Sequence, residues 1–219
     1  MKNISEERKS ISIYEIAFFF ALCCVVTLVL SNILEPIFHY FKLIEDTSLY
    51  SDASTSISLV VYTVIIGSIF EEMLYRGFLL RKLEKYGPFF AVITSSIFFG
   101  TTHQNIYQVF VIAIASTIIG YVAYKYSFKI AVLLHIMNNL NVEINSQLAN
   151  INASYSTYYQ YALFVLSLII TIKYKDIIKN INILDRFKHE KESFKTFFTR
   201  IPVLILLSHD IFFTIISAF

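Results

Sequence analysis

The stretch IFEEMLYRGF, residues 69–78, sets two adjacent carboxylates and an arginine inside one of the most apolar segments of the chain. An ionisable side chain at mid-membrane costs about 2.5–3.5 kcal/mol, so Glu71, Glu72 and Arg76 could together cost about 10 kcal/mol if all three faced lipid. We therefore expect them to face protein or water. Ionisable residues inside a membrane are functional by default, and the alternative is that these carboxylates brace neighbouring helices.

The composition around this stretch is that of an integral membrane protein. Of the 219 residues, 56% are hydrophobic and only 16% charged, whereas soluble domains carry about a quarter charged residues. Backbone polar groups inside lipid must form their hydrogen bonds within the protein, which helices and closed β-barrels allow. No alternating pattern of transmembrane strands is visible in the sequence, so the expected fold class is all-α. We expect a polytopic membrane bundle of about seven spanning helices, at residues 12–34, 57–80, 88–104, 106–124, 128–142, 157–173 and 201–219.

The basic residues predict how the chain crosses the membrane. Lys2, Arg8 and Lys9 precede the first apolar segment, and every second loop after them is again rich in Lys and Arg. Because basic loops stay on the cytoplasmic side, the amino terminus is predicted to be cytoplasmic and the carboxyl terminus external. His209 and Asp210 interrupt the last segment, which could instead be a re-entrant or interfacial helix.

The chain is expected to have three parts. Residues 1–56 hold the first transmembrane helix and an external loop, and residues 57–142 hold the polar motifs. Residues 143–219 hold a sixth helix, a basic segment at 174–200 and the last helix. The basic segment pairs apolar positions with lysines, which is typical of a helix on an anionic membrane surface; a solvated linker is the alternative.

Net charge, cysteine content and residue usage give further information on partners and cellular location. The net charge of +2 gives no basis for a nucleic-acid partner, and the neighbouring Cys23 and Cys24 offer no disulfide framework or cysteine metal site. The composition indicates the lipid bilayer as a partner. High Ile, Lys and Asn usage indicates an AT-rich bacterium, so the expected location is the bacterial cell membrane, with several passes.

Helix geometry separates the two glutamates. Glu72 and Arg76 are spaced i, i+4 with the acid nearer the amino terminus, the favourable order for an ion pair. Glu71 points about 100° away from Glu72 and has no local countercharge. A desolvated carboxylate in that position is suited to act as a general base or acid.

A histidine lies at the same expected depth as Glu71. Gly87 and Pro88 end one helix and begin the next; Glu71 lies 16 residues before Gly87 and His103 lies 16 residues after it. On an antiparallel hairpin both side chains then rise about 24 Å from the turn. The alternative for His103 is a satisfied core or interfacial residue.

A third polar group follows in LLHIMNNLN. His135 and Asn139 share one helix face and can donate hydrogen bonds to a developing oxyanion. They rise only about 9 and 15 Å from Lys129, so the helix must tilt if all four groups are to meet. Hydrogen bonding between helices is the alternative role.

The three motifs together resemble a known family. EEMLYR fits E-E-x-x-x-R, FGTTH fits F-x-x-x-H and HIMNN fits H-x-x-x-N. In this order and on separate expected helices, they resemble the CPBP family (CAAX protease and bacteriocin-processing, also called Abi). Its members include type II CAAX prenyl endopeptidases, bacteriocin-immunity proteins and related intramembrane proteases. The resemblance covers roughly residues 57–142.

The resemblance implies a helix bundle with a polar intramembrane cavity and hydrolysis of a peptide bond by activated water. Glu71 and His103 would activate the water, and His135 with Asn139 would stabilise the oxyanion. Glu72 and Arg76 would be structural. A non-catalytic bacteriocin self-immunity protein that acts by binding is the alternative function.

Metal dependence stays open at this point. Glu71, His103 and His135 could hold a divalent ion such as zinc with a position left for water. The chain lacks H-E-x-x-H, and these three candidates come from three different helices. A carboxylate acting on water with a histidine partner explains the same residues, so no cofactor is favoured.

Overall fold

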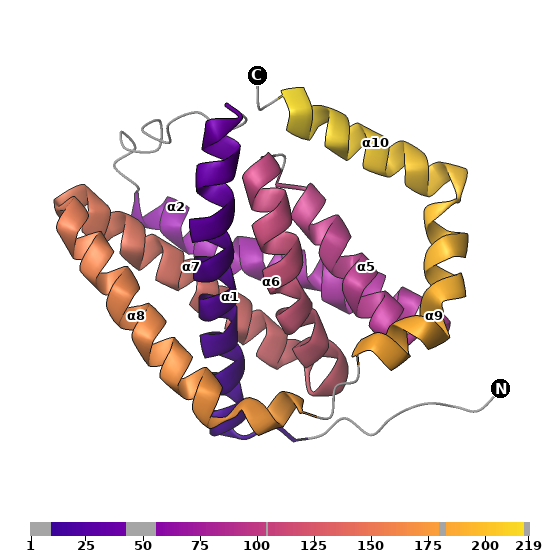
Figure 1. The fold of residues 1–219 in the computed structure, drawn as a ribbon, viewed down its shortest axis with the longest axis horizontal. Coiled ribbons are helices and arrows are strands. Elements are labelled where there is room, and N and C mark those ends of the chain that lie inside the picture. The colour runs from indigo at the N-terminus through magenta and orange to yellow at the C-terminus, as the bar shows by residue number, and fades with distance from the viewer. Residues whose placement is uncertain (1–9, 43–55, 104, 180–182, 217–219) are drawn as a thin grey trace.

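The computed structural model describes residues 10–42, 56–103, 105–179 and 183–216, and all regular structure in them is helical (Figure 1). This confirms the predicted all-α class. Every apolar segment that was expected to span forms a helix. They are α1 (Ile13–Tyr40), the helix Ile57–Tyr86, α5 (Pro88–Thr101), α6 (Ile106–Lys125), α7 (Phe128–Ile151), α8 (Ala153–Lys173) and α10 (Ile201–Ile216).

The number of helices able to cross a membrane is smaller than seven. Within the described residues four are long and apolar enough, namely α1, Ile57–Tyr86, α6 and α8. A fifth is added if the bent pair α9 (Ile183–Phe198) and α10, which meet at 80°, counts as one span. The chain is thus a multi-pass membrane protein. The basic residues at positions 2, 8 and 9, on which the predicted orientation partly depends, lie outside the described residues.

Two helices explain the lower count. α5 has 14 residues, about 21 Å of helix against a hydrocarbon core of about 30 Å. α7 has 24 residues but carries several amide side chains in its second half. Hydropathy marks a segment as apolar without showing whether lipid or protein covers it, and most residues of α5 are covered by protein.

The helix Ile57–Tyr86 changes its winding along its length. It consists of α2 (Ile57–Val61), the π-helical η2 (Tyr62–Gly67), α3 (Ser68–Glu72), the π-helical η3 (Met73–Leu80), α4 (Arg81–Leu83) and the 3₁₀ turn η4 (Glu84–Tyr86). π-helical turns inside helices are frequent at functional sites. Here they flank the α-helical turn that carries both glutamates.

α5 and α6 form a tight antiparallel hairpin. A Cβ atom on Gly100 would lie 2.7 Å from Ala113 Cβ, so only glycine fits where the two backbones approach. At the other end Gly120 of α6 faces Val92 and Ser96 of α5. The hairpin therefore holds the end of α5, where His103 follows, in a fixed place beside α6.

The basic segment forms a short 3₁₀ turn, η5 (Lys175–Ile178), and α9. Phe194, Phe197 and Phe198 of α9 pack against the buried cluster around Leu80 and Phe90. Glu190 accepts hydrogen bonds from the first backbone N–H groups of α5, Phe89 at 3.4 Å and Phe90 at 2.6 Å. The apolar face of this segment thus has a protein partner.

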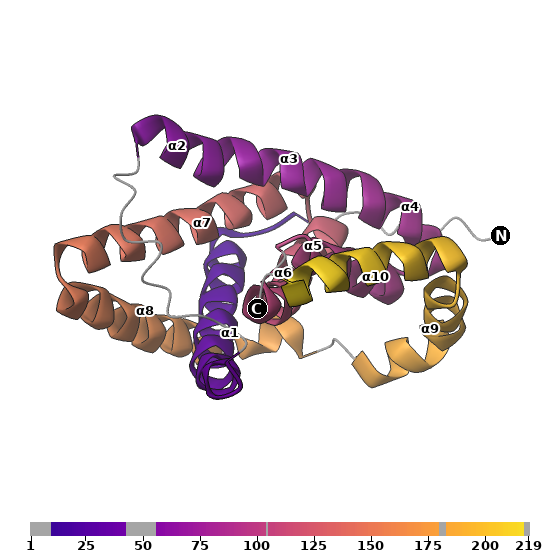
Figure 2. The ribbon, with the colours of Figure 1, turned by 90° about the horizontal axis from the view of Figure 1, so that it is seen from above.

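Two views place the helices around the polar residues. α7 runs beside the α2–α4 helix, and both are steeply inclined to α1 and α6 (Figures 1 and 2). α1, α6 and α7 meet in the main core, which includes Phe18, Phe19, Val122 and Leu134. The inclination of α7 brings His135 and Asn139, which lie in the first half of that helix, next to α3.

Candidate active site

Glu72 and Arg76 form an ion pair inside the bundle. Both side chains are fully buried, and Arg76 Nη1 lies 3.3 Å from Glu72 Oε1. Arg76 Nη2 also donates to the backbone carbonyl of Ser116 on α6 at 3.1 Å. The guanidinium carbon stands 4.6 Å from the centre of the Phe99 ring. The pair thus connects α3 and η3 to the α5–α6 hairpin.

His135 of α7 bridges the two glutamates. Its Nδ1 lies 3.0 Å from Glu72 Oε1, and because a carboxylate oxygen accepts, Nδ1 carries the hydrogen. Its Nε2 lies 3.5 Å from Glu71 Oε2. Glu71 therefore has a partner, from a helix that local sequence reasoning did not consider.

Adjacent glutamates have very different surroundings. The Glu72 side chain is fully buried, whereas that of Glu71 is 42% exposed. Successive helical residues point about 100° apart, which accounts for the difference. Glu72 orients His135 and neutralises Arg76, while Glu71 remains accessible to a water molecule or a substrate.

Asn139 lies one turn beyond His135 and contacts α3. Its Nδ2 donates to Ser68 Oγ at 2.9 Å, and Ser68 Oγ donates to the Val64 carbonyl at 2.7 Å. Ser68 was not singled out from the sequence. Its position four residues before Glu72, on the same helix face, was the available signal.

His103 approaches the site from the end of α5. Its Nδ1 lies 3.2 Å from the Phe99 carbonyl oxygen, which can only accept, so the neutral ring keeps a lone pair on Nε2. The Phe99 ring packs edge-on against both histidines, at centroid distances of 5.2 Å to His103 and 5.5 Å to His135. Among the described residues no hydrogen bond or ion pair joins His103 to Glu71.

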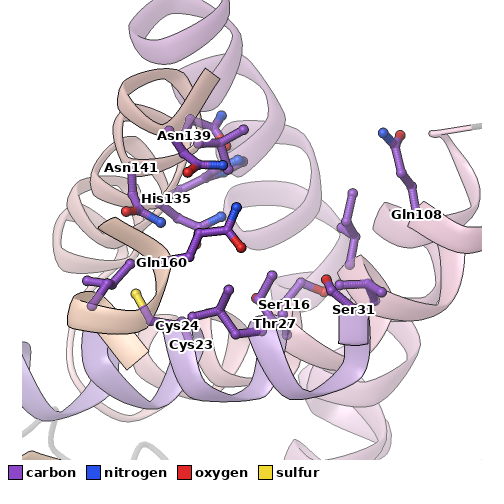
Figure 3. Close-up of a pocket in the computed structure, with 18 of the residues that line it drawn as sticks. Cys23, Cys24, Thr27, Ser31, Gln108, Ser116, His135, Asn139, Asn141 and Gln160 are labelled. Carbon is purple, nitrogen blue, oxygen red and sulfur yellow. The ribbon is translucent and has the colours of Figure 1, made fainter. Parts of the chain in front are cut away.

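A cavity of about 510 Å³ borders this cluster between α1, α6, α7 and α8. His103, His135 and Asn139 line it on one side. Figure 3 shows Gln160 of α8 reaching into the space between His135 and the α1 residues Cys24 and Thr27. α1 and α8 lie outside the segment that carries the motifs, so the sequence motifs did not indicate these walls.

The residues were also compared with the needs of a metal ion. Zinc in a catalytic site takes three protein ligands. In the part of the chain that the structure describes, no group of three or more His, Cys, Asp or Glu side chains is arranged to hold an ion. Glu71 and His135 approach each other, but His103 does not complete a ligand set with them.

A carboxylate–histidine cluster beside a polar cavity, within a multi-pass helical membrane protein, is the arrangement expected of an intramembrane protease. Residues 53–141 match the family model described as type II CAAX prenyl endopeptidase Rce1-like. This match confirms the resemblance drawn from the three motifs: residues 53–141 are similar to CAAX-type intramembrane proteases. No curated protein and no solved structure matches the chain.

Proposed function

We propose that this protein hydrolyses a peptide bond of a membrane-associated peptide or small protein, with Glu71 activating the attacking water. The observation that carries the proposal is the approach of Glu71 Oε2 to His135 Nε2, at 3.5 Å, on the accessible side of a buried ion pair. A general base must lie within hydrogen-bond reach of the proton that it removes. The half-exposed carboxylate of Glu71 is accessible to a water molecule, whereas Glu72 is fully buried.

The reaction follows from these positions. Glu71 takes a proton from water while the water oxygen attacks the carbonyl carbon, and His103 helps to orient the water from the cavity side through Nε2. Asn139 donates a hydrogen bond to the oxyanion, and His135, when both of its ring nitrogens carry a hydrogen, donates a second one from Nε2. Glu71 then returns the proton to the leaving nitrogen as the C–N bond breaks. Glu72 and Arg76 are positioning residues that act through His135.

The substitution Glu71→Gln tests this proposal because it removes the base and nearly keeps the shape. Loss of a general base lowers the rate by about 10²- to 10⁴-fold. The rate is measured with purified protein in lipid nanodiscs, and the substrate is sought by comparing the peptides in membranes that carry wild-type or Glu71→Gln protein. Glu143→Gln on α7 is the matched control, since Glu143 bonds Gln147 rather than the cluster.

Cleavage by Glu71→Gln protein at the wild-type rate would end the proposal. The binding alternative makes the opposite prediction. A non-catalytic immunity protein would keep its full protective effect when Glu71, His103, His135 and Asn139 are all replaced by alanine.

A further inference from the structure

The cavity has a definite floor and mouth along α1. Cys23 and Cys24 are only 2% exposed, Thr27 and Ser31 are half-buried, and Asn32 and Glu35 are exposed. Exposure therefore rises steadily toward the carboxyl end of α1. Cys24 and Glu35 are eleven positions apart, which corresponds to about 16 Å of helix.

α6 shows the same gradient in the opposite chain direction. Ser116 and Ile119 are buried at the floor, while Tyr107 and Gln108, in the first turn of α6, are half-buried. The mouth of the cavity thus lies where α1 ends and α6 begins. This is the same end of the bundle as the turn that carries His103.

The chain segments on the floor side and on the mouth side of the cavity differ in their charged residues. Past the floor, the helix ends carry Lys125, Lys129 and Lys173. In the sequence, residues 35–56, which begin in the last part of α1, contain four acids and one lysine, and residues 142–156 contain no Lys or Arg. Because basic loops are retained in the cytoplasm, the mouth belongs to the opposite face.

The charged residues that line the cavity are also unevenly distributed. Among the described residues that line it, Glu35 at the mouth is the only Asp, Glu, Lys or Arg. The remaining polar lining consists chiefly of neutral amides and hydroxyls, with the two site histidines. Amide side chains donate and accept hydrogen bonds and so suit a peptide backbone, whereas a carboxylate at the mouth selects a cation.

From these observations, and resting on the proposed function, we infer that the substrate enters from the non-cytoplasmic face and carries a positive charge that pairs with Glu35. The stretch of α1 that lines the cavity from Cys24 to Glu35 is long enough for about five extended residues. The cation is a Lys or Arg side chain or a free amino terminus. Glu35 is a specificity-determining residue and takes no part in the chemistry.

The direction of entry is tested without a substrate. A single cysteine is placed at the mouth by Asn32→Cys or at the basic end by Lys129→Cys, both exposed positions, in a background with Cys23→Ala and Cys24→Ala. A membrane-impermeant maleimide applied to intact cells should label the Asn32→Cys protein, and should label the Lys129→Cys protein only after permeabilisation. The reverse pattern overturns the inference. The same substitutions in the wild-type background, whose own cysteines are buried, replace the set if the cysteine-free protein does not fold.

The charge preference is tested by binding, so that it does not depend on turnover. Glu71→Gln protein in nanodiscs is titrated with a fluorescent, amino-terminally acetylated hydrophobic heptapeptide that contains one lysine, and with its acetylated norleucine analogue. Adding Glu35→Gln should weaken binding of the lysine peptide about fivefold, the value of an exposed ion pair of about 1 kcal/mol, and leave the analogue unchanged. A peptide with a free amino terminus but no lysine separates the two sources of cation.

Equal effects of Glu35→Gln on the charged and the neutral peptide would overturn the charge preference. The proposed hydrolysis fails separately, in the Glu71→Gln comparison of cleavage rates. Binding with the expected preference and no hydrolysis would therefore reject the enzyme and keep the site.

Discussion

The polar residues on the two sides of His135 differ in charge and in burial. On the α3 side, the polar residues are the ionisable Glu72 and Arg76. Both are fully buried and form an ion pair, and Arg76 also donates to the backbone carbonyl of Ser116. On the cavity side, the polar groups are mostly neutral, partly exposed amides such as Asn141 and Gln160. Buried charges need partners to offset desolvation, whereas neutral amides can exchange partners with water or substrate. The difference separates a rigid support from an adaptable binding wall.

The largest effect on stability is expected from breaking the charged side. Glu72→Leu leaves Arg76 buried without its carboxylate and His135 without its Nδ1 acceptor, at a cost of about 3–5 kcal/mol. Thermal unfolding in detergent measures the loss. The double variant Glu72→Leu/Arg76→Leu should recover much of it, because no unpaired charge remains. Equal stability of the single variant and the wild type would show that the pair is not a support.

Asn139 lies where the two sides meet, and its loss should act on the rate more than on the fold. Asn139→Ala removes a donor to the oxyanion and should lower kcat by about 10²- to 10³-fold. Asn150→Ala, an exposed amide near the end of α7 that does not line the cavity, is the matched control and should change kcat little. Equally low kcat values for both alanine variants would contradict the proposed role of Asn139 in binding the oxyanion.

The cavity wall should tolerate substitution far better than the ion pair. Tyr159 donates to Asn141 Oδ1 at 2.6 Å, and a single neutral hydrogen bond contributes about 1 kcal/mol. Asn141→Leu should therefore cost about 1 kcal/mol of stability in the same unfolding assay. A loss as large as that of Glu72→Leu would erase the proposed contrast between the two sides.

The smallest effect is expected from removal of metal ions. Glu71 and His135 approach each other, but the described residues hold no three-ligand group, so the proposed chemistry uses the side chains alone. Purified protein should keep its full rate after rigorous chelation. Loss of activity that added zinc restores would replace the proposed role of Glu71 with that of a metal ligand.

Sequence reasoning predicted the helices well and the site contacts only in part. Hydropathy located every long helix, and the 100° turn per residue separated Glu71 from Glu72 before any coordinates were considered. The spacing of Glu72 and Arg76 likewise predicted a pair that the structure places at 3.3 Å. All of these depend on residues within about one helical turn of each other, where backbone geometry dictates proximity.

The other contacts join distant segments. His135 meets Glu72 from 63 residues away, and Asn139 meets Ser68 from 71. Depth counted along ideal upright helices set His135 below Glu71, because it left out the inclination of α7. No periodicity in the sequence encodes such an inclination, since it results from how whole helices pack.

By itself, then, the sequence determined that this chain is a helical membrane protein with a family-specific set of carboxylate, histidine and amide side chains. It did so because hydropathy and residue spacing act locally along the helix. Only the tertiary structure decided that His135 joins both glutamates, and that α1 and α8 complete the cavity. Those features depend on packing between helices far apart in the chain, where the orientation of each helix selects which side chains meet.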